Sequence, residues 1–201
     1  MMVKQCLKVI ILIFSASLFA NTPPEIAKLC MDCHGKNGVS DFSDVPTIAG
    51  QPAIFIEETL FAYRDKIRPE IKSKFRYGDT SRPETDMKTI ANQLNYQQIV
   101  ELADFFSGQK FVPAKQDFDA SLVAKGKQVH WQKCKICHRE NGKVPAANAA
   151  ILAGQWSDYL IATMAYLRDG RRDTDTGMKD SIQNLSEQDW QALVAFYASQ
   201  Q

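Results

Sequence analysis

A helical spacing of apolar residues marks the last segment of each half of the chain. Ile99, Leu102 and Phe106 share one face of a helix expected over 95–106. A second helix, over 186–197, has an equivalent face made of Trp190, Leu193, Val194 and Tyr197. We expect both faces to pack against the core of their own half.

Capping residues support these two helices and apolar stretches predict two more. Asn95 precedes Gln98 by three positions, and Ser186 precedes Asp189 by three, a spacing close to a capping box. Segments 53–64 and 157–168 read as middle helices, and no strand pattern of useful length occurs. The sequence therefore predicts an all-α fold.

The chain also contains an internal duplication. Gly50 and Gly154 lie in matching Ala-Gly-Gln segments at an offset of 104, which Arg64-Asp65 and Arg168-Asp169 share. Later matches, including Met87 with Met178, have an offset of 91. The first copy thus carries 13 extra residues between Asp65 and Met87. Residues 110–119 form a polar, proline-containing linker, so we predict one domain over 21–112 and another over 113–201.

The N-terminal residues 1–20 resemble a secretory signal peptide. Lys4 and Lys8 precede a short apolar run that ends in a small residue at Ala20. The alternative is an uncleaved anchor, but the run is shorter than the roughly 20 apolar residues of a comfortable membrane span. We therefore expect a periplasmic protein without stable membrane insertion.

Composition excludes several classes of protein. Apolar residues make up 45% and charged residues 23% of the 201 residues, which is typical of a globular chain rather than a disordered one. The formal net charge of +1 argues against a polycation that binds nucleic acid. Electrostatic docking must then come from local patches. One candidate is the segment 64–76, with six basic residues, which is either a solvated loop or a docking surface for an acidic redox partner.

Each half contains one Cys-x-x-Cys-His motif. Residues 30–34 read CMDCH and residues 134–138 read CKICH. This is the attachment signature of c-type haem, in which two thiols form thioether bonds to the porphyrin and the histidine binds the iron. We therefore expect two covalently bound haem c groups. The predicted attachment residues are Cys30, Cys33, Cys134 and Cys137, and the predicted proximal ligands are His34 and His138.

Three other uses of the cysteines compete with this one. Structural zinc usually needs pairs about 15–20 residues apart, and these lie roughly a hundred apart. A thioredoxin-like motif needs a βαβ context. Two disulfides would leave both histidines without a role. The double motif in a chain expected to be exported favours haem.

A second iron ligand is expected from methionine, because Met/His ligation suits electron transfer. Met87 and Met178 align with each other and are the predicted ligands. Met164 lies in an apolar helical stretch and is assigned to packing. His130, four residues before Cys134, is assigned to packing or to the surface.

The double motif, the Ala-Gly-Gln segments and the two late methionines resemble exported diheme class I cytochromes c, including the cytochrome c-four group. The strings ILAGQWSDYL, RDGRR and FYASQQ resemble the cytochrome subunit of flavocytochrome c sulfide dehydrogenase. The resemblance implies two tandem class I domains. It also implies a proline after each motif, whose carbonyl supports the ring of the motif histidine. Pro46 fits that pattern, whereas Ala150 departs from it and leaves the support of His138 open.

The same resemblance implies a partner. In that family a separate flavin-bearing chain oxidises sulfide and passes electrons to the haems, which pass them to a soluble acceptor. This chain has no Gly-x-Gly-x-x-Gly fingerprint, so any flavin would belong to the partner. We expect an electron-transfer protein that is not an enzyme on its own. The alternatives are a free diheme shuttle to a terminal oxidase or reductase and, less favoured, a small haem peroxidase.

Overall fold

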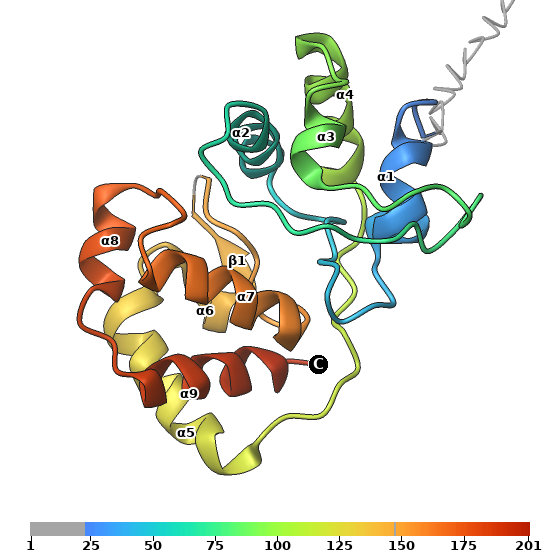
Figure 1. The fold of residues 1–201 in the computed structure, drawn as a ribbon. Helices are drawn as coiled ribbons and strands as arrows, with labels where there is room; N and C mark the ends of the chain where they lie inside the picture. Colours follow the sequence, from blue (N-terminus) through green and yellow to red (C-terminus); the bar gives the residue numbers. More distant parts are fainter. Residues whose placement is uncertain (1–22, 147) are drawn as a thin grey trace, which may run out of the picture.

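The computed structural model describes residues 23–146 and 148–201, which form two helical lobes joined by one connection (Figure 1). The predicted signal peptide lies outside the described residues. In the first half the helices are α1 (Ala27–His34), η1 (Lys36–Gly38), α2 (Ala53–Arg64), α3 (Met87–Ala91) and α4 (Tyr96–Ser107). In the second half the elements are α5 (Ala120–Val129), η2 (His130–Cys134), α6 (Arg139–Gly142), β1 (Val144–Pro145), α7 (Ser157–Arg168), α8 (Thr176–Ile182) and α9 (Glu187–Ala198).

The all-α prediction is confirmed. The two-residue β1 forms only isolated bridges, to His138 and Arg139, and no sheet occurs within the described residues. Helices α2 and α7 match the expected middle helices, and α4 and α9 begin at the expected capping boxes of Asn95 and Ser186. Among the described residues, no helix is both long and apolar enough to cross a bilayer.

Helix α8 was not expected from the sequence. Asp175 accepts a hydrogen bond from the Met178 backbone N–H and so starts this helix. An aspartate at this position satisfies one of the free N–H groups of a helix N-terminus. Met178 therefore lies in the first turn of a helix.

Each half has its own core. In the first half, α4 buries Ile99, Leu102 and Phe106 against residues of α1 and α2. In the second half, α9 crosses α5 at Gly126, where an added Cβ would lie 1.9 Å from the Ala192 carbonyl oxygen. Only glycine allows so close an approach of two helix backbones. In the second half the last helix thus packs on α5, which leads into the Cys-x-x-Cys-His motif, whereas in the first half α4 packs mainly on α2.

The duplication extends to backbone geometry. Gly50 and Gly154 have φ angles of 69° and 74°, and their N–H groups donate to the carbonyls of Phe106 and Tyr197, each at 2.8 Å. A Cβ on Gly154 would also collide with Pro113 of the connection. The glycine of each Ala-Gly-Gln segment therefore lets the chain pass close to the end of the last helix.

The glutamines of the same segments join the two halves. Gln155 donates from Nε2 to the Thr47 carbonyl at 2.9 Å, and the Thr47 N–H donates to its Oε1 at 3.0 Å. Gln51 does the same to Ile151, at 3.2 and 2.8 Å. Since Thr47 and Ile151 are themselves 104 positions apart, each half grips the equivalent residue of the other. We call this arrangement the glutamine clamp.

Replacing Gln155 by alanine should destabilise the folded protein by about 2–3 kcal/mol. The change leaves the N–H and C=O of Thr47, which is 2% exposed, without partners, and unpaired buried groups are costly. Urea unfolding of the haem-loaded protein measures the effect. The exposed Gln183→Ala is the control, with an expected change below about 0.5 kcal/mol. Equal effects of the two variants would contradict this role for the clamp.

Candidate cofactor site

A cavity of about 600 Å³ lies between the two halves and is lined mainly by apolar side chains from both. Its lining includes every residue that the sequence nominated for haem attachment or iron ligation: Cys30, Cys33, His34, Met87, Cys134, Cys137, His138 and Met178. The fold thus brings together two sets of residues that are about a hundred positions apart. Whether each residue binds as predicted stays a prediction.

Both motif histidines have one ring nitrogen fixed. His34 Nδ1 lies 2.8 Å from the Pro46 carbonyl oxygen, and His138 Nδ1 lies 2.8 Å from that of Ala150. A carbonyl oxygen only accepts hydrogen bonds, so Nδ1 carries the proton and Nε2 keeps a free lone pair. This is the tautomer that a metal-binding imidazole needs.

The question left open at Ala150 is therefore answered. The support comes from a backbone carbonyl, and any residue supplies that group, so proline is not required. Burial also lowers the pKa of both His34 and His138, which favours the neutral, metal-binding form of the ring.

The backbone around the motif cysteines has a different conformation in the two halves. The first motif is carried by α1, whereas in the second Cys134 ends η2, residues 135–137 form a turn, and His138 pairs with Pro145 in an isolated bridge. Burial raises the pKa of Cys30 to about 12 and that of Cys134 to about 11. Protonated thiols are poor ligands for a bare metal ion. The described residues also contain no cluster of three or more His, Cys, Asp or Glu that could hold one.

The methionines occupy comparable places. Met87 is the first residue of α3 and Met178 lies in the first turn of α8, and both are half-buried in the cavity wall. Met164 packs against the core of the second half, as expected for a packing residue, although it also lines the cavity. His130 is buried, with Nδ1 2.9 Å from the Tyr197 hydroxyl, so its packing role is confirmed.

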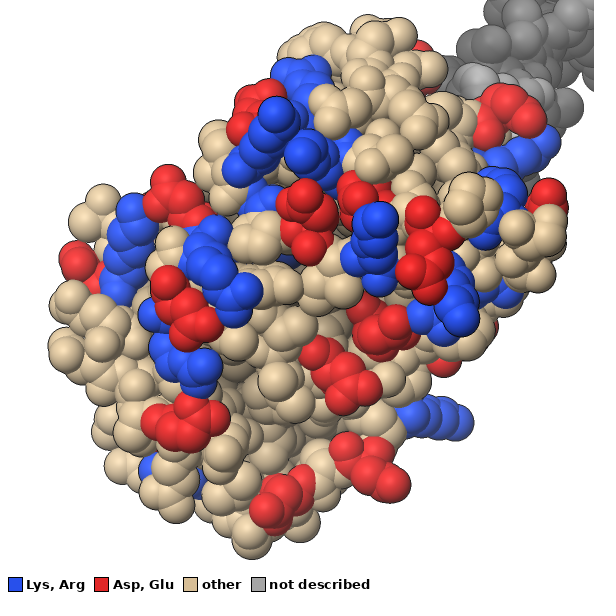
Figure 2. Space-filling view, in the orientation of Figure 1, with Lys and Arg blue, Asp and Glu red and all other residues tan. Residues whose placement is uncertain are grey.

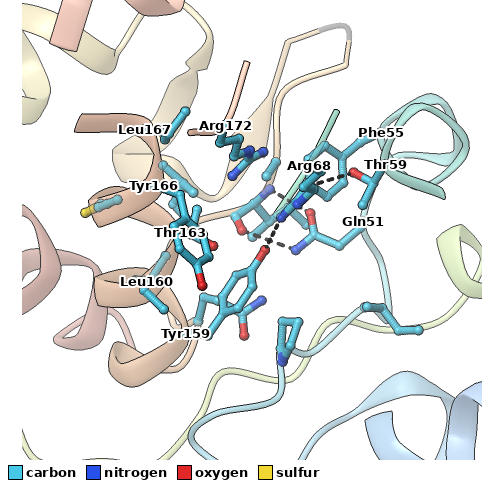
Figure 3. A pocket seen from close by; sticks show the side chains of 18 of the residues that line it. Gln51, Phe55, Thr59, Arg68, Tyr159, Leu160, Thr163, Tyr166, Leu167 and Arg172 are labelled. Atoms are coloured by element: carbon cyan, nitrogen blue, oxygen red, sulfur yellow. Dashed lines mark hydrogen bonds between the residues drawn. The ribbon is translucent and has the colours of Figure 1, made fainter. Parts of the chain in front are cut away.

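Two arginines in the cavity wall were missed by the sequence analysis. Arg68 and Arg172 are separated by the repeat offset of 104, and that match was the signal that could have revealed them. Both arginines lie just beyond the end of a helix, α2 or α7. Their backbone N–H groups donate to the carbonyls of Ala62 and Tyr166, which occupy equivalent positions in those helices. Figure 3 shows their guanidinium groups in the same part of the cavity.

These guanidinium groups form no ion pair with a carboxylate among the described residues. Arg68 is 6% exposed and donates to Thr59 and Tyr159. Burial and the nearby charge of Arg68 lower the pKa of Arg172 to about 10, so both stay charged at neutral pH. One buried and one half-buried cation in an apolar cavity are unfavourable without anions. Haem carries carboxylate groups, so the cavity fits this cofactor in charge as well as in apolar character.

Comparison with known proteins agrees with this geometry. The cytochrome c family model matches residues 123–201. Cytochrome c-552 of Acidithiobacillus ferridurans is 28% identical, covering 90% of this chain and 77% of its own. Cytochrome c4 of Azotobacter vinelandii is 27% identical, covering 85% and 83%. A thiosulfate dehydrogenase electron acceptor of Thiomonas intermedia is 26% identical, covering 90% and 82%.

Solved structures agree in fold. Reduced cytochrome c4 from Pseudomonas stutzeri superimposes with a TM-score of 0.69, at 23% identity, covering 87% of this chain and 95% of its own. Cytochrome c4 of Acidithiobacillus ferrooxidans gives 0.65, at 27% identity, covering 85% and 98%. The chain is similar to the diheme cytochromes c4. It has the tandem class I cytochrome fold, takes two covalent haem c groups and transfers electrons.

Replacing Arg172 by methionine should lower a haem reduction potential by the equivalent of about 1 kcal/mol, because a buried cation favours the reduced, more negative site. The exposed Arg171→Met removes the same charge from the surface, where solvent screens it, and should shift the potential much less. Redox titration of both variants, with haem content checked, measures the difference. Equal shifts would show that Arg172 has no special role in the cavity.

Proposed function

We propose that each half holds one haem c through the same four kinds of residue. The two cysteines would attach the porphyrin through thioether bonds, and the histidine and the methionine would supply ligands to the iron. The residues are Cys30, Cys33, His34 and Met87 in the first half, and Cys134, Cys137, His138 and Met178 in the second. The hydrogen bonds of His34 and His138 to carbonyls support this assignment, because they leave Nε2 free toward the iron.

The haem groups supply one-electron redox chemistry when bound. The residues of this chain position them and exclude water. The apolar cavity wall lowers the local dielectric, the two arginines offset the haem carboxylates, and the glutamine clamp fixes one half against the other. Because both sites line one cavity, electrons can pass between them within the chain.

We infer that the protein is exported and accepts electrons from a separate dehydrogenase. The observation that carries this proposal is the single cavity shared by two ligand sets, which suits a carrier more than an enzyme with an open substrate site. The favoured donor is a flavin-bearing sulfide dehydrogenase subunit, supported by the resemblance of the second half to the haem subunit of such enzymes. A soluble acceptor would take the electrons onward.

A thiosulfate-oxidising enzyme is the second candidate donor. It is favoured by the similarity to the Thiomonas intermedia electron acceptor, which extends over 90% of this chain. A free shuttle that serves a terminal oxidase or reductase is a third role, in which no stable dehydrogenase partner exists.

Purification of the tagged protein from its own host separates these roles. A larger partner chain with flavin absorbance, and haem reduction by sulfide in the purified complex, is the expected result. A partner without flavin that reduces the haems with thiosulfate would favour the second candidate. A chain that purifies alone and is reduced by neither salt would contradict the dehydrogenase proposal.

The absorption band of the oxidised protein that marks a methionine–iron bond should lose about half of its intensity when either Met87 or Met178 is replaced. It should disappear when both are replaced. Met164→Leu is the matched control, because Met164 also lines the cavity, and it should leave the band intact. Loss of the band in the Met164 variant instead would reassign the ligand. High-spin iron in the unaltered protein would favour the peroxidase alternative.

A further inference from the structure

The extra residues of the first half form a loop that closes on itself. The repeat offset of 104 holds as far as Arg68 and Arg172, so the eighteen residues 69–86 correspond to only five, 173–177. Ser73 and Thr85 pair through two backbone hydrogen bonds of 2.8 and 3.0 Å, which close the neck of the loop. In Figure 1 this segment leaves α2, passes beside α1 and returns to α3. We call residues 69–86 the cover loop.

The tip of the cover loop is held on the first Cys-x-x-Cys-His motif. The N–H groups of Arg76 and Tyr77 donate to the Asp32 carbonyl at 2.8 and 3.0 Å. Arg82 forms an ion pair with the Asp32 carboxylate at 2.5 Å. Asp32 lies between the two cysteines of the motif, so the loop lies over the edge of the site where thioether bonds would form.

Further contacts hold the loop to the segment after the motif. Arg76 pairs with Asp44 at 2.6 Å, and the Tyr77 ring packs edge-on against Phe42. Phe75, at the base of the tip, is 8% exposed. Many distributed contacts of this kind indicate a fixed loop rather than a solvated one.

Three of the six basic residues of the segment 64–76 are buried or paired with a carboxylate. Arg68 is buried in the cavity, and Arg64 and Arg76 pair with Asp65 and Asp44. Over the face shown in Figure 2, basic and acidic side chains alternate and no field of a single sign stands out. The three lysines of the segment, Lys66, Lys72 and Lys74, are exposed, as are Ile67 and Ile71, at 51% and 58%.

Among the residues that the structure describes, no comparable loop covers the second motif. Ile136 occupies the position equivalent to Asp32 and is 81% exposed, and Cys137 beside it is also exposed. Trp131 and Val144 add further exposed apolar surface, at 63% and 38%. An isoleucine so exposed next to a haem attachment residue is an unfavourable arrangement for a surface that meets only water.

Basic side chains surround this apolar surface in the sequence. Four of them have no carboxylate partner among the described residues, and Glu140 is the one acidic residue within 131–144. They are Lys133, Lys135, Arg139 and Lys143. Lys135 Nζ lies 3.1 Å from the centroid of the Trp131 ring. Exposed apolar residues with unpaired basic residues beside them in the sequence are complementary to a redox protein that presents acidic side chains around its own cofactor.

We propose that the two haem sites have different access to partners, and that electrons enter and leave this protein at the second motif. The cover loop shields the attachment edge of the first haem, and the surface around Ile136 and Cys137 binds an acidic redox partner. This inference rests on the proposed electron-transfer function and specifies which site performs the exchange.

The test uses the haem-loaded protein and hexacyanoferrate(III), an anionic one-electron oxidant. Each electron lost by a reduced haem iron converts one hexacyanoferrate(III) to hexacyanoferrate(II). Stopped-flow rates are compared for Lys133→Glu/Lys135→Glu and for Lys72→Glu/Lys74→Glu. Both pairs change the net charge by the same amount, so the difference between them reports where the reagent reacts.

We expect the second-half pair to lower the rate constant roughly fivefold or more at low salt, with the effect lost at high salt, as for a steered encounter. The first-half pair should change it less than about twofold. Equal effects, or a larger effect of the first-half pair, would overturn the inference. Haems that do not exchange electrons with the reagent at all would instead overturn the proposed function.

A second variant tests the cover loop itself. Asp32→Ile gives the first motif the residue of the second and removes the partner of Arg82. In the Asp32→Ile background the loop is loosened, so adding Lys72→Glu/Lys74→Glu should now lower the rate constant severalfold at low salt. The reciprocal Ile136→Asp is the control. In that background, adding Lys72→Glu/Lys74→Glu should still change the rate constant by less than about twofold. If the Asp32→Ile protein has full haem content and its rate constant is still unaffected by Lys72→Glu/Lys74→Glu, the inference is also overturned.

Discussion

The hydrogen bond from each motif histidine to a carbonyl twelve residues later organises the structure around it. To place Pro46 and Ala150 at the right position, the chain must turn back sharply after each motif, and residues with positive φ make this turn in both halves. The residue after each carbonyl, Thr47 or Ile151, is the one gripped by a glutamine of the opposite half. The residue that orients each imidazole is therefore followed directly by the residue that contacts the other half.

Much of this arrangement could be read from local patterns. The helices α2, α4, α7 and α9 follow from apolar spacing and capping residues, and the motifs follow from covalent chemistry that demands a fixed spacing. Repetition made several of these inferences stronger, because the motifs, the Ala-Gly-Gln segments and the methionines each have a counterpart in the other half. The backbone support of His138 was left open only because a side-chain pattern was used to infer a main-chain interaction.

Features that depend on contacts between distant segments could not be predicted. Nothing near Gln51 indicates that its partner is Ile151, and nothing near Arg68 indicates that it lies buried beside Tyr159. The same limit applies to the extra residues of the first half. Their basic composition suggested a solvated or docking segment, whereas the fold uses Arg76 and Arg82 as anchors to Asp44 and Asp32.

The difference between Asp32 and Ile136 has a consequence for the storage of electrons. A donor that releases electrons in pairs needs two one-electron sites, and an electron held at a solvent-facing site is open to loss to stray oxidants such as dioxygen. In this chain the first site is covered by a loop and the second is exposed. The first site could therefore hold an electron away from solvent while the second exchanges electrons with partners. The difference between Asp32 and Ile136, together with the extra loop of the first half, gives the two copies different functions in electron exchange.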